Sequence, residues 1–136
     1  MTHTLKFDGA SRGNPGAASY GIIVIDESGK EVITDYGYLG VATNNVAEYC
    51  GLLRGLIICE KMGIRRLNAM GDSNLVIQHV TGKWKVRNAK LRELYQQIKD
   101  IESKFESISY EHVYRKFNKR ADKLANQALD ELRTPG

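Results

Sequence analysis

The spacing of hydrophobic residues changes several times along the chain, and each change predicts a new element. Apolar and polar residues alternate over residues 4–8, which is typical of a strand that ends near Asp8. A continuous, β-branched apolar run over residues 20–25 predicts a second, buried strand, and residues 32–39 predict a third. Short turn-rich segments separate the three, so we expect them to pair antiparallel.

The rest of the chain alternates between helical and strand-like patterns. Apolar residues recur at helical spacing in four segments, residues 46–62, 75–80, 91–105 and 121–132. Short strand-like runs fall between them, at residues 67–70 and 108–114. Three strands, a helix, a strand, two helices, a strand and a final helix predict a mixed α/β sheet in a single domain spanning residues 1–136.

Charge and cysteine content limit the kinds of partner and the cellular compartment that we expect for the protein. The 20 Lys and Arg against 16 Asp and Glu give a net charge of +4, which permits a polyanionic partner without requiring one. Cys50 and Cys59 lie nine positions apart in one predicted helix, about 13 Å along its axis, which is too far for a disulfide. With no secretory signal and no apolar run of about 18 residues, we expect a cytoplasmic protein that makes no membrane contact. We also expect a monomer.

Four of the acidic residues lie at the predicted ends of elements. Asp8 and Asp72 close the first and fourth strands, and Glu48 and Asp122 lie near the starts of two helices. If those two strands are neighbours, all four side chains can converge. Clustered carboxylates repel one another unless cations lie between them, and Mg²⁺ prefers oxygen ligands. Two such ions can activate a water and stabilise the leaving oxygen of a phosphodiester.

Each of these acids also has a purely structural interpretation. Glu48 has the spacing of a capping box from Asn45, and Asp72 could cap the helix that follows it. Asp122 could form a solvated ion pair within its own helix, and Asp8 could belong to an ordinary turn. Periodicity alone leaves these alternatives open.

The segments around the four acids resemble the type 1 ribonuclease H family, in order and over nearly the whole chain. The matching segments are FDGASRGNPG at residues 7–16, TNNVAE at 43–48, GDS at 71–73 and NKRADKLA at 118–125. Each motif is weak by itself, but the four in order are specific. The resemblance implies a ribonuclease H-like fold, with a five-stranded mixed sheet of three antiparallel and then two parallel strands, flanked by helices.

The resemblance also implies an activity. Members of this family are endoribonucleases that hydrolyse the RNA strand of RNA/DNA hybrids by two-metal-ion catalysis and leave 5′-phosphate and 3′-hydroxyl ends. Two Mg²⁺ ions would bind with the substrate, and Mn²⁺ could replace them. The metal-binding catalytic carboxylates would be Asp8, Glu48, Asp72 and Asp122.

Short polar residues near these motifs are the implied substrate contacts. Asn14, Asn44 and Asn45 would meet the minor groove of the hybrid, Thr43 would lie near a DNA phosphate, and Asn74 would be a further groove contact. The wide minor groove of an A-like hybrid displays 2′-hydroxyls that such side chains can recognise. Turn and cap chemistry is the structural alternative for the same residues.

The sequence departs from many family members in two places. The basic protrusion of those members is reduced here to residues 83–87, so we expect weaker hybrid binding, with Trp84 packing rather than stacking. Arg115 takes the place of a mobile histidine, while His112 falls in a strand, either packed or exposed. An arginine cannot act as a general base, so we hypothesise that Arg115 aids catalysis electrostatically by steadying a phosphate.

Three rival functions follow from the same features. A binding module that has lost turnover is disfavoured because all four carboxylates are present. An integrase or junction resolvase is disfavoured because those relatives lack the paired TNNxxE and DGxxxGNPG motifs. Cleavage of double-stranded RNA besides the hybrid stays open.

Overall fold

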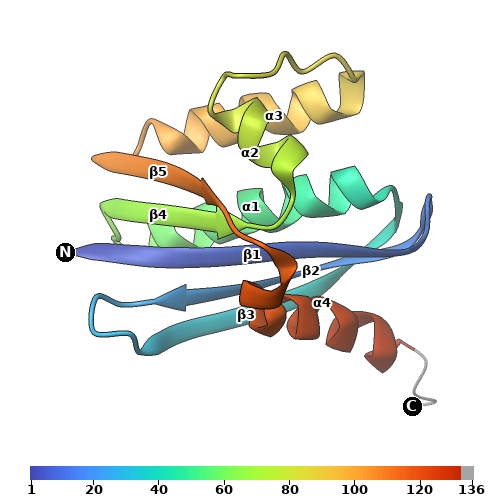
Figure 1. Ribbon diagram of the computed structural model, residues 1–136, viewed down its shortest axis with the longest axis horizontal. Helices are drawn as coiled ribbons and strands as arrows, with labels where there is room; N and C mark the ends of the chain where they lie inside the picture. The colour runs from blue at the N-terminus through green and yellow to red at the C-terminus, as the bar shows by residue number, and fades with distance from the viewer. Residues whose placement is uncertain (133–136) are drawn as a thin grey trace.

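A single five-stranded sheet forms the centre of the molecule, with strand order β3-β2-β1-β4-β5 (Figure 1). The computed structural model describes residues 1–132, so the last four residues of the predicted domain lie outside the described part. The strands are β1 (Thr2–Gly13), β2 (Gly16–Ile25), β3 (Glu31–Ala42), β4 (Arg66–Gly71) and β5 (Ser107–His112). The first three pair antiparallel, and β1, β4 and β5 pair parallel, which confirms the predicted mixed sheet.

Helices cover both faces of this sheet. They are α1 (Asn44–Lys61), α2 (Asn74–Val80), α3 (Ala89–Glu102) and α4 (Lys119–Glu131), with a 3-10 turn η1 (Arg115–Phe117) before α4. Successive residues of a strand point to opposite faces. A Cβ on Gly51 of α1 would meet Tyr20, whereas a Cβ on the next residue of β2, Gly21, would meet the backbone of α4. Thus α1 and α4 lie on opposite faces, and α3 packs on α1 (Figure 1).

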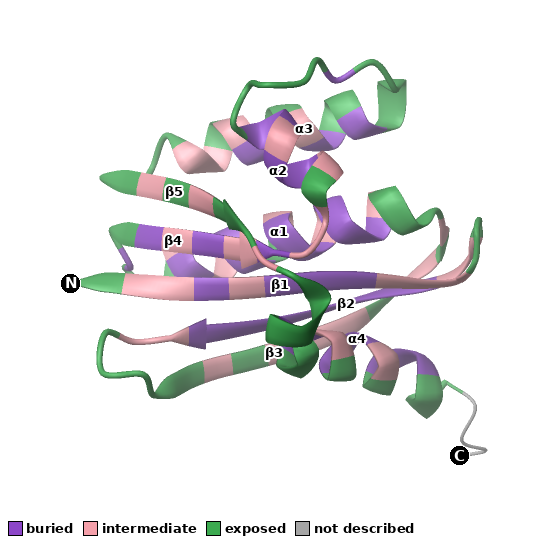
Figure 2. Cartoon of the chain, viewed as in Figure 1, coloured by how far each residue is buried: buried purple, intermediate pink, exposed green. Residues whose placement is uncertain are grey.

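The hydrophobic core lies between the sheet and α1. Leu5 and Phe7 of β1, Ile22 of β2, and Leu52 and Leu56 of α1 are fully buried. In Figure 2 the buried positions run along the central strands and the inward sides of the helices. The burial of each of these side chains stabilises the folded protein by roughly 1.5–3 kcal/mol relative to leaving it exposed. The core therefore fixes α1 against β1, and with it the start of α1.

Several predicted boundaries were wrong, and two of them concern Asp8 and His112. The first strand does not end at Asp8 but continues to Gly13, and Asp8 pairs with Gly21 of β2. What ends there is the parallel pairing with β4, whose last pair is Phe7 with Gly71. The fifth strand ends at His112, two residues earlier than predicted, and His112 is exposed. In both cases the limits of a strand depend on its neighbours, which periodicity does not report.

Two further expectations concern the two cysteines and membrane-spanning helices. Cys50 and Cys59 are both free, as their spacing predicted. Within residues 1–132, no helix combines the length and the apolar character that crossing a bilayer requires.

Candidate metal centre

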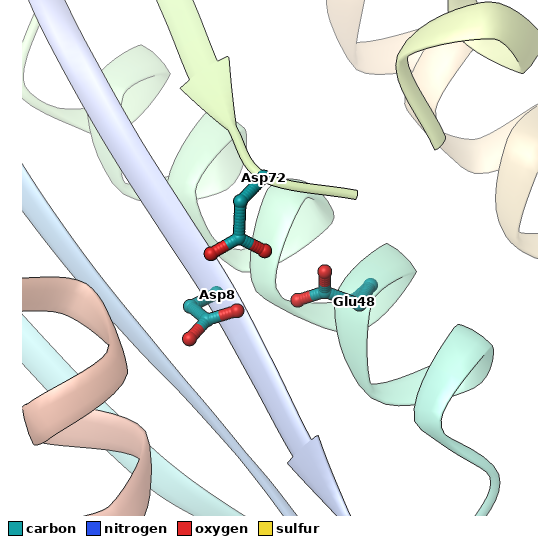
Figure 3. Close-up of side chains that lie close together, drawn as sticks. All are labelled: Asp8, Glu48 and Asp72. Atoms are coloured by element: carbon teal, nitrogen blue, oxygen red, sulfur yellow. The ribbon is translucent and has the colours of Figure 1, made fainter. Parts of the chain in front are cut away.

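Three carboxylates from separate elements meet at one edge of the parallel strands (Figure 3). Asp8 lies in β1, Glu48 in the second turn of α1 and Asp72 directly after β4, and one oxygen of each lies within 4.8 Å of the others. Because β1 and β4 are parallel and Phe7 pairs with Gly71, the next residue of each strand falls at the same edge. Asp8 and Glu48 are 4% and 3% exposed. The predicted convergence of these three acids is thus observed.

Glu48 is held against β1 by a close approach of the two backbones. A Cβ on Gly9 would lie 2.3 Å from the carbonyl carbon of Ala47 and from the amide nitrogen of Glu48, so only glycine fits there. The Gly9 N–H donates a hydrogen bond to Oε1 of Glu48. The capping-box interpretation of Glu48 is wrong, because Thr43 is the N-cap of α1 and its hydroxyl accepts from the Val46 N–H.

The structural interpretations of Asp72 as a helix cap and of Asp8 as a turn residue are also wrong. The N-cap of α2 is Ser73, whose hydroxyl oxygen accepts from the Val76 N–H, so Asp72 is free of that role. Its Oδ2 accepts a hydrogen bond from Nδ2 of Asn118 at 3.4 Å. Asp8 is buried inside a strand and belongs to no turn.

Asp122 lies beside this cluster, in the first turn of α4. After burial and the charges of Glu48 and Asp72, the neighbouring Asp122 carboxyl also raises the pKa of Asp8. The Asn126 amide donates to the Asp122 backbone carbonyl at 3.0 Å and to its Oδ1 at 3.3 Å. No ion pair in residues 1–132 includes Asp122, so the solvated-pair interpretation is wrong. The geometry therefore brings Asp8, Glu48 and Asp72 together, and the part of Asp122 in the same site stays a prediction.

The electrostatics of the cluster call for a cation. Burial, followed by the charge of Glu48, raises the pKa of Asp8 far above its ordinary value. Burial also raises the pKa of Glu48 to about 7, although the Gly9 N–H and the charge of Arg115 act in the opposite direction. Buried like charges are unfavourable until a positive charge lies between them. A donor set made only of carboxylate oxygens fits a hard divalent cation.

Arg115 lies within electrostatic reach of these acids. It is the first residue of η1 and is exposed, and its charge lowers the pKa of Glu48. The neighbouring exposed cation, Lys116, lies 5.0 Å from the centre of the Phe117 ring. Arg115 thus acts on the charge of Glu48, and its role in steadying a phosphate stays a prediction.

Most of the predicted substrate contacts line a groove at the start of α1. Asn14, Thr43 and Asn45 border an open cavity of about 470 Å³, and Asn88 and Lys90 at the start of α3 form another part of its wall. Neither of these last two residues was predicted from the sequence, although an asparagine before an amphipathic helix is an N-cap signal. Asn88 does cap α3, as Thr43 caps α1. These residues thus have structural roles besides any contact with substrate.

The other two predicted contacts lie outside that groove wall. The Asn44 backbone N–H donates to Oδ1 of Asn14 at 3.1 Å, which joins the β1–β2 turn to the start of α1. Asn74 is the exposed first residue of α2, and its Oδ1 accepts from Gln78 at 3.1 Å. Asn44 therefore orients a groove residue, and Asn74 follows directly on the loop that carries Asp72.

The short loop before α3 carries exposed cations. Lys83, Lys85 and Arg87 are exposed, and Trp84 is 48% exposed, so this ring is packed only in part. The Arg92 guanidinium donates to the Val86 carbonyl at 3.3 Å, which ties the loop to α3. The loop thus exposes positive charge and one aromatic side chain, and it is attached to α3 by this hydrogen bond.

Comparison with known proteins agrees with this architecture. Residues 6–128 match the family described as "Reverse transcriptase-like". The bifunctional protein Rv2228c of Mycobacterium tuberculosis is 43% identical over 131 residues, which cover 96% of this chain and 36% of that protein. Ribonuclease HI of Halobacterium salinarum is 40% identical over 125 residues, which cover 92% of this chain and 63% of that protein. The chain therefore spans about a third of the length of the first relative and less than two thirds of the second.

Solved structures match over nearly their whole length. RNase H1 of Halobacterium salinarum superposes with a TM-score of 0.94 at 38% identity, covering 96% of this chain and 99% of that one. LC11-RNase H1, solved in complex with an RNA/DNA hybrid, has a TM-score of 0.93 at 32% identity, covering 97% and 99%. The fold and the acidic cluster define a ribonuclease H-like protein with carboxylates that could hold a divalent metal ion. More particularly, the chain belongs to the ribonuclease H family.

Proposed function

We propose that this protein is an endoribonuclease that hydrolyses the RNA strand of RNA/DNA hybrids. The observation that carries the proposal is the gathering of Asp8, Glu48 and Asp72 at one sheet edge, with Asp122 beside Asp8. Four acids from four separate elements have no common structural task, and their mutual repulsion opposes folding unless cations bind. The hybrid bound to LC11-RNase H1 supports the choice of substrate.

The four carboxylates would hold two Mg²⁺ ions together with the substrate. Mn²⁺ could serve in place of Mg²⁺. When bound, such ions supply a nucleophilic water and Lewis-acid stabilisation of the leaving oxygen. The chain contributes orientation: the Gly9 N–H holds the Glu48 carboxylate, and the Asn118 amide holds that of Asp72. Arg115 steadies a phosphate of the RNA. Cleavage of the bond from phosphorus to the 3′-oxygen leaves 5′-phosphate and 3′-hydroxyl ends.

The groove at the start of α1 accounts for substrate selection in this proposal. Asn14 and Asn45 would meet the minor groove, and Thr43 would lie near a phosphate of the DNA strand. Lys90 adds a positive charge to the same wall, which suits a phosphate backbone. Asn44 and Asn74 would be further polar contacts. Recognition of 2′-hydroxyls in the wide minor groove would confine cutting to RNA.

Hydrolysis of an end-labelled RNA/DNA hybrid in Mg²⁺ tests the proposal. We expect the RNA strand to be cut only when metal is present, and Asp8→Asn to lower the rate by at least about 100-fold, because it removes a charged ligand. Double-stranded DNA is the negative control, and double-stranded RNA shows whether the substrate range is wider. A folded protein that binds the hybrid without cutting it in either Mg²⁺ or Mn²⁺ would instead be a binding module.

A further inference from the structure

The N-cap of α4 differs from the N-caps of the other α-helices in residues 1–132. Thr43, Ser73 and Asn88 have extended backbones, and each side chain accepts the N–H three residues further on. Asn118, before α4, has φ −123° and ψ 23°, and its side chain makes no capping hydrogen bond. Asparagine is among the best N-cap residues, so its side chain forgoes a stabilising local contact.

The Asn118 side chain points into the metal centre instead. Its Nδ2 donates to the backbone carbonyl of Phe7 at 2.9 Å and to Oδ2 of Asp72 at 3.4 Å. Phe7 directly precedes Asp8, and α4 carries Asp122 four residues after Asn118. The Asn118 amide therefore contacts the Asp72 carboxylate and also β1, the strand that carries Asp8. Asn118 itself lies at the start of α4, the helix that carries Asp122.

The orientation of this amide is determined by its surroundings. Asn118 is 1% exposed, and exchanging its nitrogen and oxygen would place Oδ1 against two acceptors, the Phe7 carbonyl and the Asp72 carboxylate. As it stands, Oδ1 is buried and has no hydrogen-bond partner within the described chain. An uncapped helix and an unpaired buried carbonyl both oppose stability. Such local costs are typical of a side chain that serves a function.

We propose that Asn118 is a positioning residue of the metal centre. Its N–H group fixes the orientation of the Asp72 carboxylate through one oxygen and leaves the other oxygen for a cation. Its bond to the Phe7 carbonyl holds the first turn of α4, and hence Asp122, against β1 beside Asp8. This role rests on the proposed function, because it concerns the same carboxylates, but metal binding can be measured without cleavage.

Two substitutions separate positioning from packing. Asn118→Ala removes both donated hydrogen bonds, so we expect kcat to fall roughly 10- to 100-fold with KM changed less than about threefold. In calorimetric titration without substrate, its Mn²⁺ affinity should fall about tenfold. Asn118→Asp has the same shape but turns an acceptor toward Asp72 and Phe7, so its kcat should be no higher than that of Asn118→Ala. A side chain that only fills space predicts the reverse order.

Asn68→Ala is the matched control. Asn68 joins β4 to β5, since its Oδ1 accepts from the Ser109 hydroxyl at 2.9 Å, and it lies outside the carboxylate cluster. It should keep wild-type kcat and Mn²⁺ affinity. Circular dichroism and thermal melting of each variant give the folded fraction, and if Asn118→Ala does not fold, the isosteric Asn118→Asp carries the test through its kcat.

Several results would overturn the role of Asn118. They are a kcat of Asn118→Asp above half of the wild-type value, a loss in Asn118→Ala no larger than its unfolded fraction, or wild-type Mn²⁺ affinity in Asn118→Ala. If the wild-type protein does not cleave the hybrid, the proposed function fails instead. The Mn²⁺ affinities of wild type and Asn118→Ala then decide the role of Asn118 by themselves.

Discussion

The buried carboxylates determine how the stability of the metal-free protein depends on pH. Burial raises the pKa of Glu48 from 4.5 to about 7, and Asp8 is raised as well. A carboxyl group whose pKa is higher in the folded than in the unfolded state favours folding when protonated. With respect to Glu48, the metal-free protein should therefore be most stable below about pH 4.5 and lose stability as the pH rises to about 7. Asp8 acts in the same direction, and its contribution continues to fall above that pH.

Asp8→Asn should stabilise the metal-free protein at pH 7. Because the pKa of Asp8 is raised far above 7, the aspartate must take up a proton when the chain folds at pH 7, whereas asparagine need not. A shift of one pKa unit corresponds to about 1.4 kcal/mol, so the free energy of unfolding should rise by at least that amount. Thermal melting in EDTA measures the effect, and Mg²⁺ should raise the Tm of the wild type more than that of the variant.

Asp26→Asn provides a contrast to this substitution. The Asp26 carboxylate is partly exposed and accepts hydrogen bonds from the Ser28 hydroxyl and from the N–H groups of Lys30 and Ser28, which lower its pKa. Its replacement should not raise the Tm. Equal melting temperatures for Asp8→Asn and the wild type in EDTA would show that repulsion among the carboxylates does not limit stability.

Arg115 should act on turnover rather than on folding. A charged hydrogen bond to a phosphate is worth about 1.5–3 kcal/mol, so Arg115→Ala should lower kcat by about tenfold or more and leave the Tm unchanged. Arg115→Lys keeps the charge and should recover part of the rate. Lys116→Ala, which removes the adjacent exposed cation, is the control. An Arg115→Ala enzyme with wild-type kcat would remove Arg115 from the mechanism.

At the scale of elements, the contact between β1 and α1 determines where Glu48 lies. Gly9→Ala would place a methyl group 2.3 Å from the backbone of α1, so the helix and strand must separate. We expect a loss of about 1–3 kcal/mol in the free energy of unfolding, as is usual for overpacking, together with reduced kcat. Urea denaturation measures the first and hybrid cleavage the second.

Thr2→Ala, at the exposed start of the same strand, should change stability by less than about 0.5 kcal/mol. If Gly9→Ala were as stable and active as Thr2→Ala, the close approach of the two backbones would not be what holds Glu48. Pairing with β2 explains why β1 continues past Asp8, because β2 pairs with β1 as far as Gly13 while the pairing with β4 ends at Phe7.

At the scale of the whole molecule, the exposed cations of the loop before α3 should govern the affinity for the hybrid. Each phosphate that a lysine neutralises makes binding weaken with rising salt. The double substitution Lys83→Ala/Lys85→Ala should raise KM at low salt and leave kcat unchanged. It should also lower the slope of log KM against log salt by about one for each phosphate that is no longer neutralised.

Lys61→Ala/Lys104→Ala removes the same charge from exposed positions at the end of α1 and just after α3. This control should affect KM and its salt dependence less. If both double variants changed KM and its slope equally, net charge alone would explain the binding, and the loop would have no special part in it.

Local sequence pattern was enough to predict the order of the elements, the mixed sheet and the four candidate acids. Helical and strand periodicities are local, because they depend on which face of each segment is buried. The order of four motifs was specific enough to indicate the family before any geometry was known. Asp8, Glu48, Asp72 and Asp122 were therefore identified from the sequence, although each had a structural alternative.

The tertiary structure decided which alternatives hold and what surrounds the acids. The pairing of Phe7 with Gly71 brings Asp8 and Asp72 to one edge of the sheet. The Gly9 N–H donates a hydrogen bond to Glu48, which lies 39 positions away in the sequence. Asn118 reaches Phe7 across 111 positions, and Asn88 of another helix borders the groove. Periodicity reports that a face is buried but not which neighbour covers it, so contacts between residues distant in sequence emerge only when the strands and helices pack together.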